Sequence, residues 1–308
     1  MLDIRENVPL AEMTTFKIGG LARYFVDAKN DAAIKEAIQW AKSKGVPFLM
    51  HAGGSNVLVP DDGIDALVIK VTCRERTLGG PRLTANAGCT LLEMICMASD
   101  AGLGGWEKLA GIPGSIGGAI RGNAGAFGSE IKDVIENVNA LNSETYEVRD
   151  FKNAECDFSY RQSFFKKHPE WIILRGTVRL TPVNTYESRQ LIKETITERE
   201  KRHLQNVQAA GSYFMNPVAP DWVQQMFEKE KGMKARNGRV PAGWLIEKAG
   251  LKGAREGGAV ASEQHPNYIV NENDASSNDV IRLALRIKKA VKDLFEVELE
   301  EEAVVIGK

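Results

Sequence analysis

The sequence predicts an α+β protein with more than one domain, and three observations support this. Strand and helix patterns alternate over the first 70 residues, a glycine-rich α/β segment follows, and a charged helix pattern begins after Pro182. At 308 residues the chain is long enough for two or three domains, each with its own core. We expect residues 1–70, 71–185 and 186–308 to form three parts.

The first part combines short strands with one amphipathic helix. Strand patterns are found in RYFVDA from Arg23, PFLMHA from Pro47 and ALVIKV from Ala66. The segment DAAIKEAIQWAKSKG from Asp31 has the helical period, and Gly45 ends it. The apolar face of this helix consists of Ala33, Ile34, Ala37, Ile38 and Ala41. These patterns predict a small α/β unit.

The second and third parts are predicted from similar patterns. A helix from about Thr90 to Ala101, opened by a threonine cap, follows the strand RLTANAG, and VIENVNAL and WIILRGTVRL are later strands. A charged helix is expected from Tyr186 to Gln205 as a connector with a solvated face. Short helices around Trp222 and Trp244, a strand YIVN, a helix from about Ser277 to Leu294 and a final strand complete the chain.

Two glycine-rich sites are the strongest functional signal. HAGGSNVLV begins at His51, and GIPGSIGGAIRGNAGAFG begins at Gly111. A tight turn explains one or two glycines, but it explains the spacing GxxGxxGG poorly, whereas successive backbone N–H groups can form an anion-binding nest. Side chains such as Ser55, Asn56 and Ser115 add donors. Two such loops favour a pyrophosphate, and neither matches GxxxxGK[ST] or the GxGxxG fingerprint.

Composition narrows the class of ligand. The chain has 40 basic and 41 acidic residues, so neither a nucleic acid nor a membrane surface is expected as a partner. No apolar run approaches the roughly 20 residues of a membrane span, and MLDIRENVPL lacks the apolar region of a signal peptide. We therefore expect a cytoplasmic protein with a small polar or anionic ligand.

Cysteines and histidines give no metal-binding pattern. The four cysteines Cys73, Cys89, Cys96 and Cys156 contain no CxxC pair, and the four histidines do not complete a ligand set with them. No metal is predicted. The cysteines are expected to be small buried apolar residues rather than nucleophiles.

Six motifs occur in the order of a known enzyme family. They are TTFKIGG from Thr14, AGGSNVLV from Ala52, the glycine-rich segment from Gly111, FSYRQSFFK from Phe158, GSYFMNP from Gly211 and PAGWLIEKAGLKG from Pro241. From about residue 10 to the C-terminus, the chain resembles UDP-N-acetylenolpyruvoylglucosamine reductase. The short segment between Phe165 and Trp171 resembles the class that lacks an extra tyrosine-bearing loop.

The resemblance implies a fold and a reaction. The fold would combine a two-part FAD-binding region of the vanillyl-alcohol-oxidase (PCMH) type with a C-terminal α+β substrate domain. NADPH, as co-substrate, would reduce noncovalently bound FAD, which would then reduce UDP-N-acetylglucosamine enolpyruvate to UDP-N-acetylmuramate. This is a step of peptidoglycan synthesis. Such an enzyme must supply orientation, positive charge at the substrate carboxylate and one proton.

Three residues match the catalytic residues of the family. Arg161 and Glu302 would stabilise the enolate-like intermediate, and Ser212 would protonate it. Taken alone, Ser212 is more simply a helix cap or turn residue, and Arg161 is more simply a surface ion-pair partner. Strand alternation does not separate Glu302 from the neighbouring carboxylates, so Glu300 and Glu301 stay as alternatives. The family pattern LExE selects Glu302.

Other residues are predicted to contact the cofactor or the substrate. The cofactor-binding set is Gly53, Gly54, Ser55, Asn56, Gly111, Ile112, Pro113, Gly114, Ser115, Gly117, Gly118, Ala119, Asn123 and Gly125. The substrate-binding set is Tyr160, Tyr213, Asn216 and His265. Tyr160 and His265 are equally compatible with packing roles.

The sequence departs from the family pattern at Met215, where the family commonly has lysine, and reduced charge near the substrate is expected. Two other functions compete with the reductase. One is a flavin-dependent oxidase of the same fold that acts on an alcohol or sugar, although no flavin-tethering motif is present. The other is a catalytically silent nucleotide-binding protein. We expect a monomer.

Overall fold

The computed structural model describes residues 2–202 and 207–306, and it confirms the α+β class. The described residues fall into two compact units. Unit 1 contains those of Met1–Val8, Ala22–Gly54 and Asp65–Lys201, and unit 2 contains those of Pro9–Leu21, Ser55–Ile64 and Arg202–Lys308. The three-part division of the chain stays a prediction.

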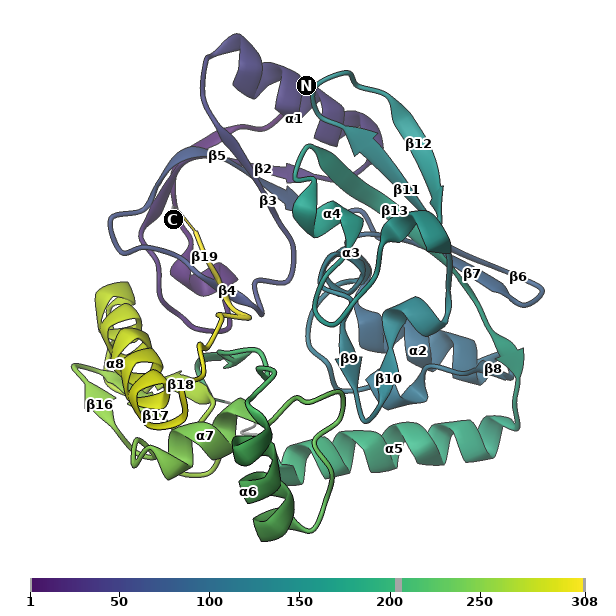
Figure 1. The fold of residues 1–308 in the computed structure, drawn as a ribbon. Coiled ribbons are helices and arrows are strands. Elements are labelled where there is room, and N and C mark those ends of the chain that lie inside the picture. The colour runs from purple at the N-terminus through teal and green to yellow at the C-terminus, as the bar shows by residue number, and fades with distance from the viewer. Residues whose placement is uncertain (1, 203–206, 307–308) are drawn as a thin grey trace. The chain divides into compact units, whose positions relative to one another are not determined.

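The first sheet of unit 1 has the strand order β1-β2-β5-β3, and Figure 1 labels β2, β5 and β3. Its strands are β1 (Arg5–Pro9), β2 (Leu21–Ala28), β3 (Phe48–His51) and β5 (Ile64–Val71). Helix α1 (Asp31–Ser43) connects β2 to β3, which runs parallel to β5. The Asn30 side chain caps α1 by accepting a hydrogen bond of 2.8 Å from the N–H of Ala33. The predicted α/β unit is therefore present.

The second sheet of unit 1 is antiparallel, with the order β12-β11-β13-β7-β6. Its strands are β6 (Arg76–Gly79), β7 (Arg82–Asn86), β11 (Ile135–Asn142), β12 (Val148–Lys152) and β13 (Trp171–Arg179). The helices that accompany it are α2 (Leu91–Asp100), α3 (Ile116–Arg121), α4 (Phe164–Lys167), η2 (Glu107–Leu109), η3 (Ile131–Asp133) and η4 (Asn153–Cys156). Short strand pairs are β8 (Leu103–Gly104) with β14 (Thr181–Pro182), and β9 (Gly125–Ala126) with β10 (Ser129–Glu130).

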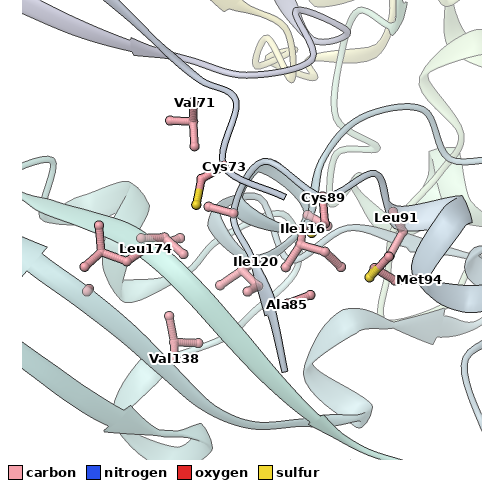
Figure 2. Packing of buried hydrophobic residues seen from close by; sticks show 14 of the residues in the cluster. Val71, Cys73, Ala85, Cys89, Leu91, Met94, Ile116, Ile120, Val138 and Leu174 are labelled. Atoms are coloured by element: carbon pink, nitrogen blue, oxygen red, sulfur yellow. The ribbon is translucent and has the colours of Figure 1, made fainter. Parts of the chain in front are cut away.

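One apolar core joins the two sheets and the helices of unit 1. Figure 2 shows part of it, where residues of α3 such as Ile116 and Ile120 face Val138 and Leu174 of the second sheet. A Cβ at Gly176 would lie 2.5 Å from Cδ1 of Ile120, so the glycine allows α3 to pack closely on β13. Cys73, Cys89 and Cys156 are buried as predicted, and Cys96 is partly buried. Burial raises the pKa of the Cys156 thiol to about 12, which keeps it protonated.

Helix α5 (Thr185–Arg202) is the predicted charged connector. Its first turns are attached to unit 1 by Ser188, whose hydroxyl donates a 2.7 Å hydrogen bond to the buried Glu107 carboxylate, and by the ion pair of Arg189 with Asp100. The predicted continuation of the helix to Gln205 lies outside the described residues.

Unit 2 contains a four-stranded sheet in the order β15-β18-β17-β16. Its strands are β15 (Ala209–Ser212), β16 (Arg255–Glu256), β17 (Ala259–Ala261) and β18 (Tyr268–Asn271), and its helices are η1 (Ala11–Met13), α6 (Asp221–Lys231), α7 (Ala242–Lys248) and α8 (Ser277–Phe295). Helix α8 packs on β16 and β17, and its N-terminus has a capping box formed by Ser276 and Asp279 (Figure 1). A parallel pair, β4 (Val57–Leu58) with β19 (Val304–Val305), brings the C-terminal segment to residues 57–58.

The last helix ends one residue later than expected, and the final strand does not follow it directly. Helix α8 continues through Phe295, and Glu296 ends it in the left-handed conformation, with φ of 59°. Phe295 is buried, and its ring lies 6.2 Å from that of Trp222. The alternation of buried Val297 and Leu299 with exposed glutamates nevertheless persists, although the described strand β19 begins only at Val304. No helix among the described residues combines the length and apolar character needed to cross a membrane.

Candidate functional site

The two glycine-rich sites meet in unit 1. Gly53 and Gly54 follow strand β3, and the segment from Gly111 to Ser115 precedes α3. A Cβ on Gly53 would lie 3.1 Å from Cα of Gly114, so the two backbones approach more closely than larger residues allow. Gly114 also has φ of 121°, a conformation that favours glycine. The structure thus forms a glycine cradle, which we define as residues Gly53, Gly54 and 111–115.

Backbone donors are available in the glycine cradle. Across residues 2–202 and 207–306, no partner is found for the N–H groups of Gly53, Gly114 and Ser115. The nitrogen of Ser115 would lie 3.8 Å from a Cβ placed on Gly53, so donors from both turns converge. Successive free N–H groups of this kind suit a phosphate oxygen.

The first turn of α3 does not offer the same donors. The N–H of Ile116 donates to Cys89, that of Gly117 to Ala87 and that of Gly118 to the Ser115 hydroxyl, at 2.8, 3.0 and 3.2 Å. A Cβ on Gly117 would lie 2.8 Å from Cβ of Ala87, so this glycine is required for packing. The cofactor contacts predicted for Gly117, Gly118 and Ala119 stay predictions.

Arg161 lies on a tight turn of unit 1. Ser159 and Gln162 exchange two backbone hydrogen bonds of 3.1 and 3.0 Å across the turn, and Arg161 has φ of 57°. Glycine is the usual residue at such a left-handed position, so an arginine there is strained and must be held by its surroundings. The guanidinium lies 5.2 Å from the ring centroid of Tyr160 and donates a 3.1 Å hydrogen bond to the carbonyl of Gly125.

Neighbouring side chains hold this turn. The amide nitrogen of Asn123 donates to the carbonyl of Ser159 at 2.8 Å, and the ammonium of Lys166 donates to the carbonyl of Arg161 at 3.0 Å. Asn123 and Gly125, predicted as cofactor ligands, thus also connect the glycine-rich segment to Arg161. The sequence did not indicate Lys166, because a lysine in FSYRQSFFK carries no signal that it contacts the turn.

Ser212 and Glu302 come together in unit 2. The N–H of Glu302 donates a 2.8 Å hydrogen bond to the carbonyl of Tyr213, the residue that follows Ser212. The N–H of Met215 donates a 2.9 Å hydrogen bond to the backbone carbonyl of Glu300. The segment that carries the glutamates therefore runs antiparallel beside residues 213–215, although about 90 residues separate the two in sequence.

The three candidate carboxylates have different surroundings. Glu301 forms an ion pair with Lys288 of α8 at 3.0 Å, and Glu300 is exposed. Glu302 is half-buried, and its carbonyl accepts a 3.0 Å hydrogen bond from the Asn56 side chain. Glu301 is thus occupied by a structural contact, which favours Glu302 over Glu301 as the functional residue.

Removal of the Lys288 ammonium is expected to destabilise the protein. The Lys288→Met variant leaves the Glu301 carboxylate, whose side chain is only 25% exposed, without its cation, and we expect the free energy of unfolding to fall by about 1 kcal/mol. The control is Lys289→Met on the same helix, whose ion pair with Asp293 is 77% and 60% exposed and should cost only about 0.3 kcal/mol. Urea unfolding of both variants measures the difference. Equal losses would mean that the Lys288 pair does not fix this segment.

The residues predicted to bind substrate in unit 2 also have structural contacts. Tyr213 is buried, with its ring 5.1 Å from that of Phe214, and burial together with the charge of Glu301 raises the pKa of its hydroxyl. The side-chain oxygen of Asn216 accepts a 3.0 Å hydrogen bond from the N–H of Ala242 at the start of α7. His265 packs against Tyr268, with ring centroids 4.9 Å apart. Substrate contacts by these residues and by Tyr160 stay predictions.

The candidate residues are divided between the two units. The glycine cradle, Asn123, Gly125, Tyr160 and Arg161 belong to unit 1. Ser55, Asn56, Ser212 and Glu302 belong to unit 2 with the other predicted substrate residues. No group of three or more potential metal ligands is found among the described residues.

Comparison with known proteins identifies the class of both regions. Residues 22–149 match the FAD binding domain family, and residues 202–306 match the C-terminal domain of UDP-N-acetylenolpyruvoylglucosamine reductase. With the α+β fold, these matches define a flavin-dependent oxidoreductase.

Relatives of known identity match nearly the whole chain. UDP-N-acetylenolpyruvoylglucosamine reductase of Solibacter usitatus is 32% identical and that of Carboxydothermus hydrogenoformans is 37% identical, each over 99% of this chain and over 97% and 94% of the relative. The crystal structure of the reductase from Thermus caldophilus is 28% identical, with a TM-score of 0.77 over 99% of this chain and 98% of that one. The chain belongs to the UDP-N-acetylenolpyruvoylglucosamine reductase family.

The glycine cradle fits the cofactor that this family membership implies. FAD contains a diphosphate, and the N–H groups of Gly53, Gly114 and Ser115 have no partner among the residues that the structure describes. A Cβ at Gly53 would fill the space beside them. These donors are neutral, so a phosphate held there would be bound through hydrogen bonds rather than through an opposite charge.

Proposed function

We propose that the protein reduces UDP-N-acetylglucosamine enolpyruvate to UDP-N-acetylmuramate, with NADPH as co-substrate and noncovalent FAD as cofactor. The 2.8 Å hydrogen bond between the Glu302 N–H and the Tyr213 carbonyl supports this most directly, because it joins the backbone beside Ser212 to Glu302. Membership of the reductase family supports the same substrate.

Bound FAD would supply hydride transfer from NADPH to the enolpyruvyl double bond. The glycine cradle would hold the FAD diphosphate through backbone N–H groups, with further proposed contacts from Ser55, Asn56, Gly117, Gly118, Ala119, Asn123 and Gly125. Ile112 and Pro113, inside the cradle, would limit access of water to the same region.

The chain would make the substrate accept a hydride by binding its carboxylate. An enol ether is electron-rich, so addition of a hydride requires positive charge at the attached carboxylate. The planar guanidinium of Arg161 is permanently charged and suits this group. Its strained turn would present it without reorganisation.

Ser212 would then donate a proton to the carbon alpha to the carboxylate, and Glu302 would stabilise the enolate together with Arg161. A hydroxyl is a weak acid in water, so this transfer needs a dry site and a strongly basic carbanion. Tyr160, Tyr213, Asn216 and His265 are proposed to contact the nucleotide sugar. Met215 is uncharged, so it adds no positive charge near the nucleotide sugar.

Stopped-flow absorbance of the flavin tests the proposal. Purified protein should release yellow FAD on denaturation, oxidise NADPH only slowly by itself, and turn over when UDP-N-acetylglucosamine enolpyruvate is added. Flavin that stays attached to the denatured chain would favour an oxidase with a tethered cofactor. Reduced flavin that does not respond to this substrate would refute the reductase proposal.

The glycine cradle should lose affinity for FAD when Gly53 becomes valine. The new Cβ would lie 3.1 Å from Cα of Gly114 and would push the donor groups apart, so we expect the FAD dissociation constant to rise at least tenfold, or about 1.4 kcal/mol. Fluorescence titration of the apoprotein with FAD measures it. The control is Gly79→Val, since a Cβ at Gly79 meets nothing within 4 Å. Equal affinities of the two variants would argue against the cradle.

We also propose that the enzyme acts as a monomer in the cytoplasm, where NADPH and nucleotide sugars are available. Sedimentation velocity of the FAD-loaded protein tests the oligomeric state. A species of twice the chain mass would refute the monomer.

A further inference from the structure

We infer that Asn123 is a positioning residue for Arg161: its side-chain amide fixes the turn of residues 159–162 to the glycine-rich segment and so sets the direction of the guanidinium. This inference rests on the proposed function, in which Arg161 binds the substrate carboxylate. It gives Asn123 a role in the substrate step that is separate from any contact with the cofactor.

Asn123 is buried, and its side-chain amide is hydrogen-bonded through both its nitrogen and its oxygen. It is 0% exposed and has φ of 42°. Its amide nitrogen donates to the carbonyl of Ser159 at 2.8 Å, and its amide oxygen accepts from the N–H of Lys132 at 3.3 Å. The amide nitrogen and the amide oxygen are therefore both hydrogen-bonded to other segments of unit 1. Because the side chain is fully buried, water does not replace either hydrogen bond when it is lost.

The Ser159 carbonyl is the point where this contact acts on the turn. It accepts one hydrogen bond from the Gln162 N–H at 3.0 Å, which closes the turn, and a second from Asn123. A carbonyl oxygen has two lone pairs, so both are used. Loss of the Asn123 donor leaves the Ser159 carbonyl with only one of its two hydrogen bonds. The peptide plane that contains this carbonyl can then rotate.

Arg161 is sensitive to such a rotation because its backbone is strained. The left-handed conformation at φ of 57° is unfavourable for a residue with a side chain, and it persists only when neighbouring contacts hold it. Lys166 holds the carbonyl of Arg161, and Gly125 accepts from its guanidinium at 3.1 Å. Asn123 and Gly125 lie two residues apart, so one short segment fixes both the backbone before Arg161 and the end of its side chain.

A double-mutant cycle separates positioning from general destabilisation. The variants are Asn123→Ala, Arg161→Ala and the double variant, each measured at saturating FAD. The first readout is the rate at which the enolpyruvyl substrate reoxidises the NADPH-reduced flavin. The second is the dissociation constant of the product UDP-N-acetylmuramate, measured by calorimetry on the oxidised protein, which does not require turnover.

Asn153→Ala is the matched control. The amide nitrogen of Asn153 also donates two hydrogen bonds to this region, to the carbonyls of Lys132 and Ile135 at 2.8 and 2.7 Å, but none to the Arg161 turn. Asn123→Asp is the second variant, in case the alanine variant does not fold. It keeps the side-chain volume and the acceptor for Lys132, but it replaces the donor to Ser159 by a carboxylate oxygen that repels the Ser159 carbonyl, so its effect on the substrate step should be at least as large as that of alanine.

We expect Asn123→Ala to slow the substrate step about thirtyfold and to weaken product binding about tenfold when Arg161 is present, and to change either by less than about threefold when Arg161 is absent. Asn153→Ala should have the same small effect in both backgrounds. Two outcomes would overturn this inference and leave the proposed function intact. One is an equal effect of Asn123→Ala with and without Arg161. The other is an Asn123→Ala enzyme of normal rate when the Arg161→Ala enzyme is slow. An unchanged Arg161→Ala enzyme would refute the proposed function of Arg161 and this inference with it.

Discussion

The Ser212→Ala enzyme is expected to reduce its flavin with NADPH at the normal rate and to reduce the enolpyruvyl substrate about a thousandfold more slowly. The proposed role of Ser212 belongs only to the second half-reaction, in which the carbanion needs a proton, and a general acid typically contributes about 10²–10⁴ to the rate. Stopped-flow absorbance separates the two half-reactions, because the flavin bleaches in the first and recovers its colour in the second.

Two further serine variants make this result specific. Ser212→Cys retains a proton donor and should recover part of the lost rate. Ser277→Ala removes a buried serine of the same unit, whose hydroxyl donates to the Asp61 carboxylate, and it should leave both half-reactions within about threefold. If flavin reduction by NADPH were the step lost in Ser212→Ala, Ser212 would be misassigned.

Local patterns were sufficient to predict most elements of the fold. Helix α1 follows from one apolar face and the stop signal at Gly45, and strands β5 and β13 follow from runs of branched apolar residues. The C-terminal segment was harder, since Phe295 fits both a strand pattern and the last turn of a helix. The ring of Phe295 packs against those of Trp222 and Trp244, and this packing favours the helix. The local sequence does not show these contacts.

The glycine-rich segment illustrates a second limit. Its spacing predicted a ligand-binding loop, yet Gly117 is required by the approach of Ala87, and the N–H groups of the first turn of α3 have partners within the chain. A glycine that makes room for a ligand and one that makes room for a neighbouring strand are identical in sequence. Only the three-dimensional contacts separate Gly53 and Gly114, whose N–H groups have no partner within residues 2–202 and 207–306, from Gly117.

The pairing of Ser212 with Glu302 required the structure as well. Period-2 alternation gave Glu300 and Glu302 the same face and could not choose between them. Lys288 lies 13 residues before Glu301 on a different element, so the ion pair that occupies Glu301 has no local signature. The resemblance to the reductase family supplied the choice of Glu302, and the antiparallel contact with residues 213–215 gives it a physical basis.

The Arg161→Lys enzyme should keep its positive charge and still lose most of its substrate step. A lysine ammonium is a point charge without the planar fork that binds a carboxylate through two parallel hydrogen bonds. The Gly125 carbonyl also loses a donor that reaches it at 3.1 Å, so the new side chain is no longer fixed. We expect the second half-reaction to slow by about a hundredfold and KM for the substrate to rise by about tenfold.

Arg179→Lys is the control, because it makes the same replacement at an arginine outside the proposed site. The guanidinium of Arg179 is 65% exposed and forms an ion pair with Glu136. It should leave both half-reactions unchanged, because exposed ion pairs contribute little. Arg161→Lys should also leave the dissociation constant of FAD within about threefold of normal, since the proposed diphosphate donors are backbone groups of the glycine cradle. A loss of FAD affinity in Arg161→Lys that equals its loss of substrate turnover would mean that Arg161 acts on the cofactor, and the carboxylate would need a different partner.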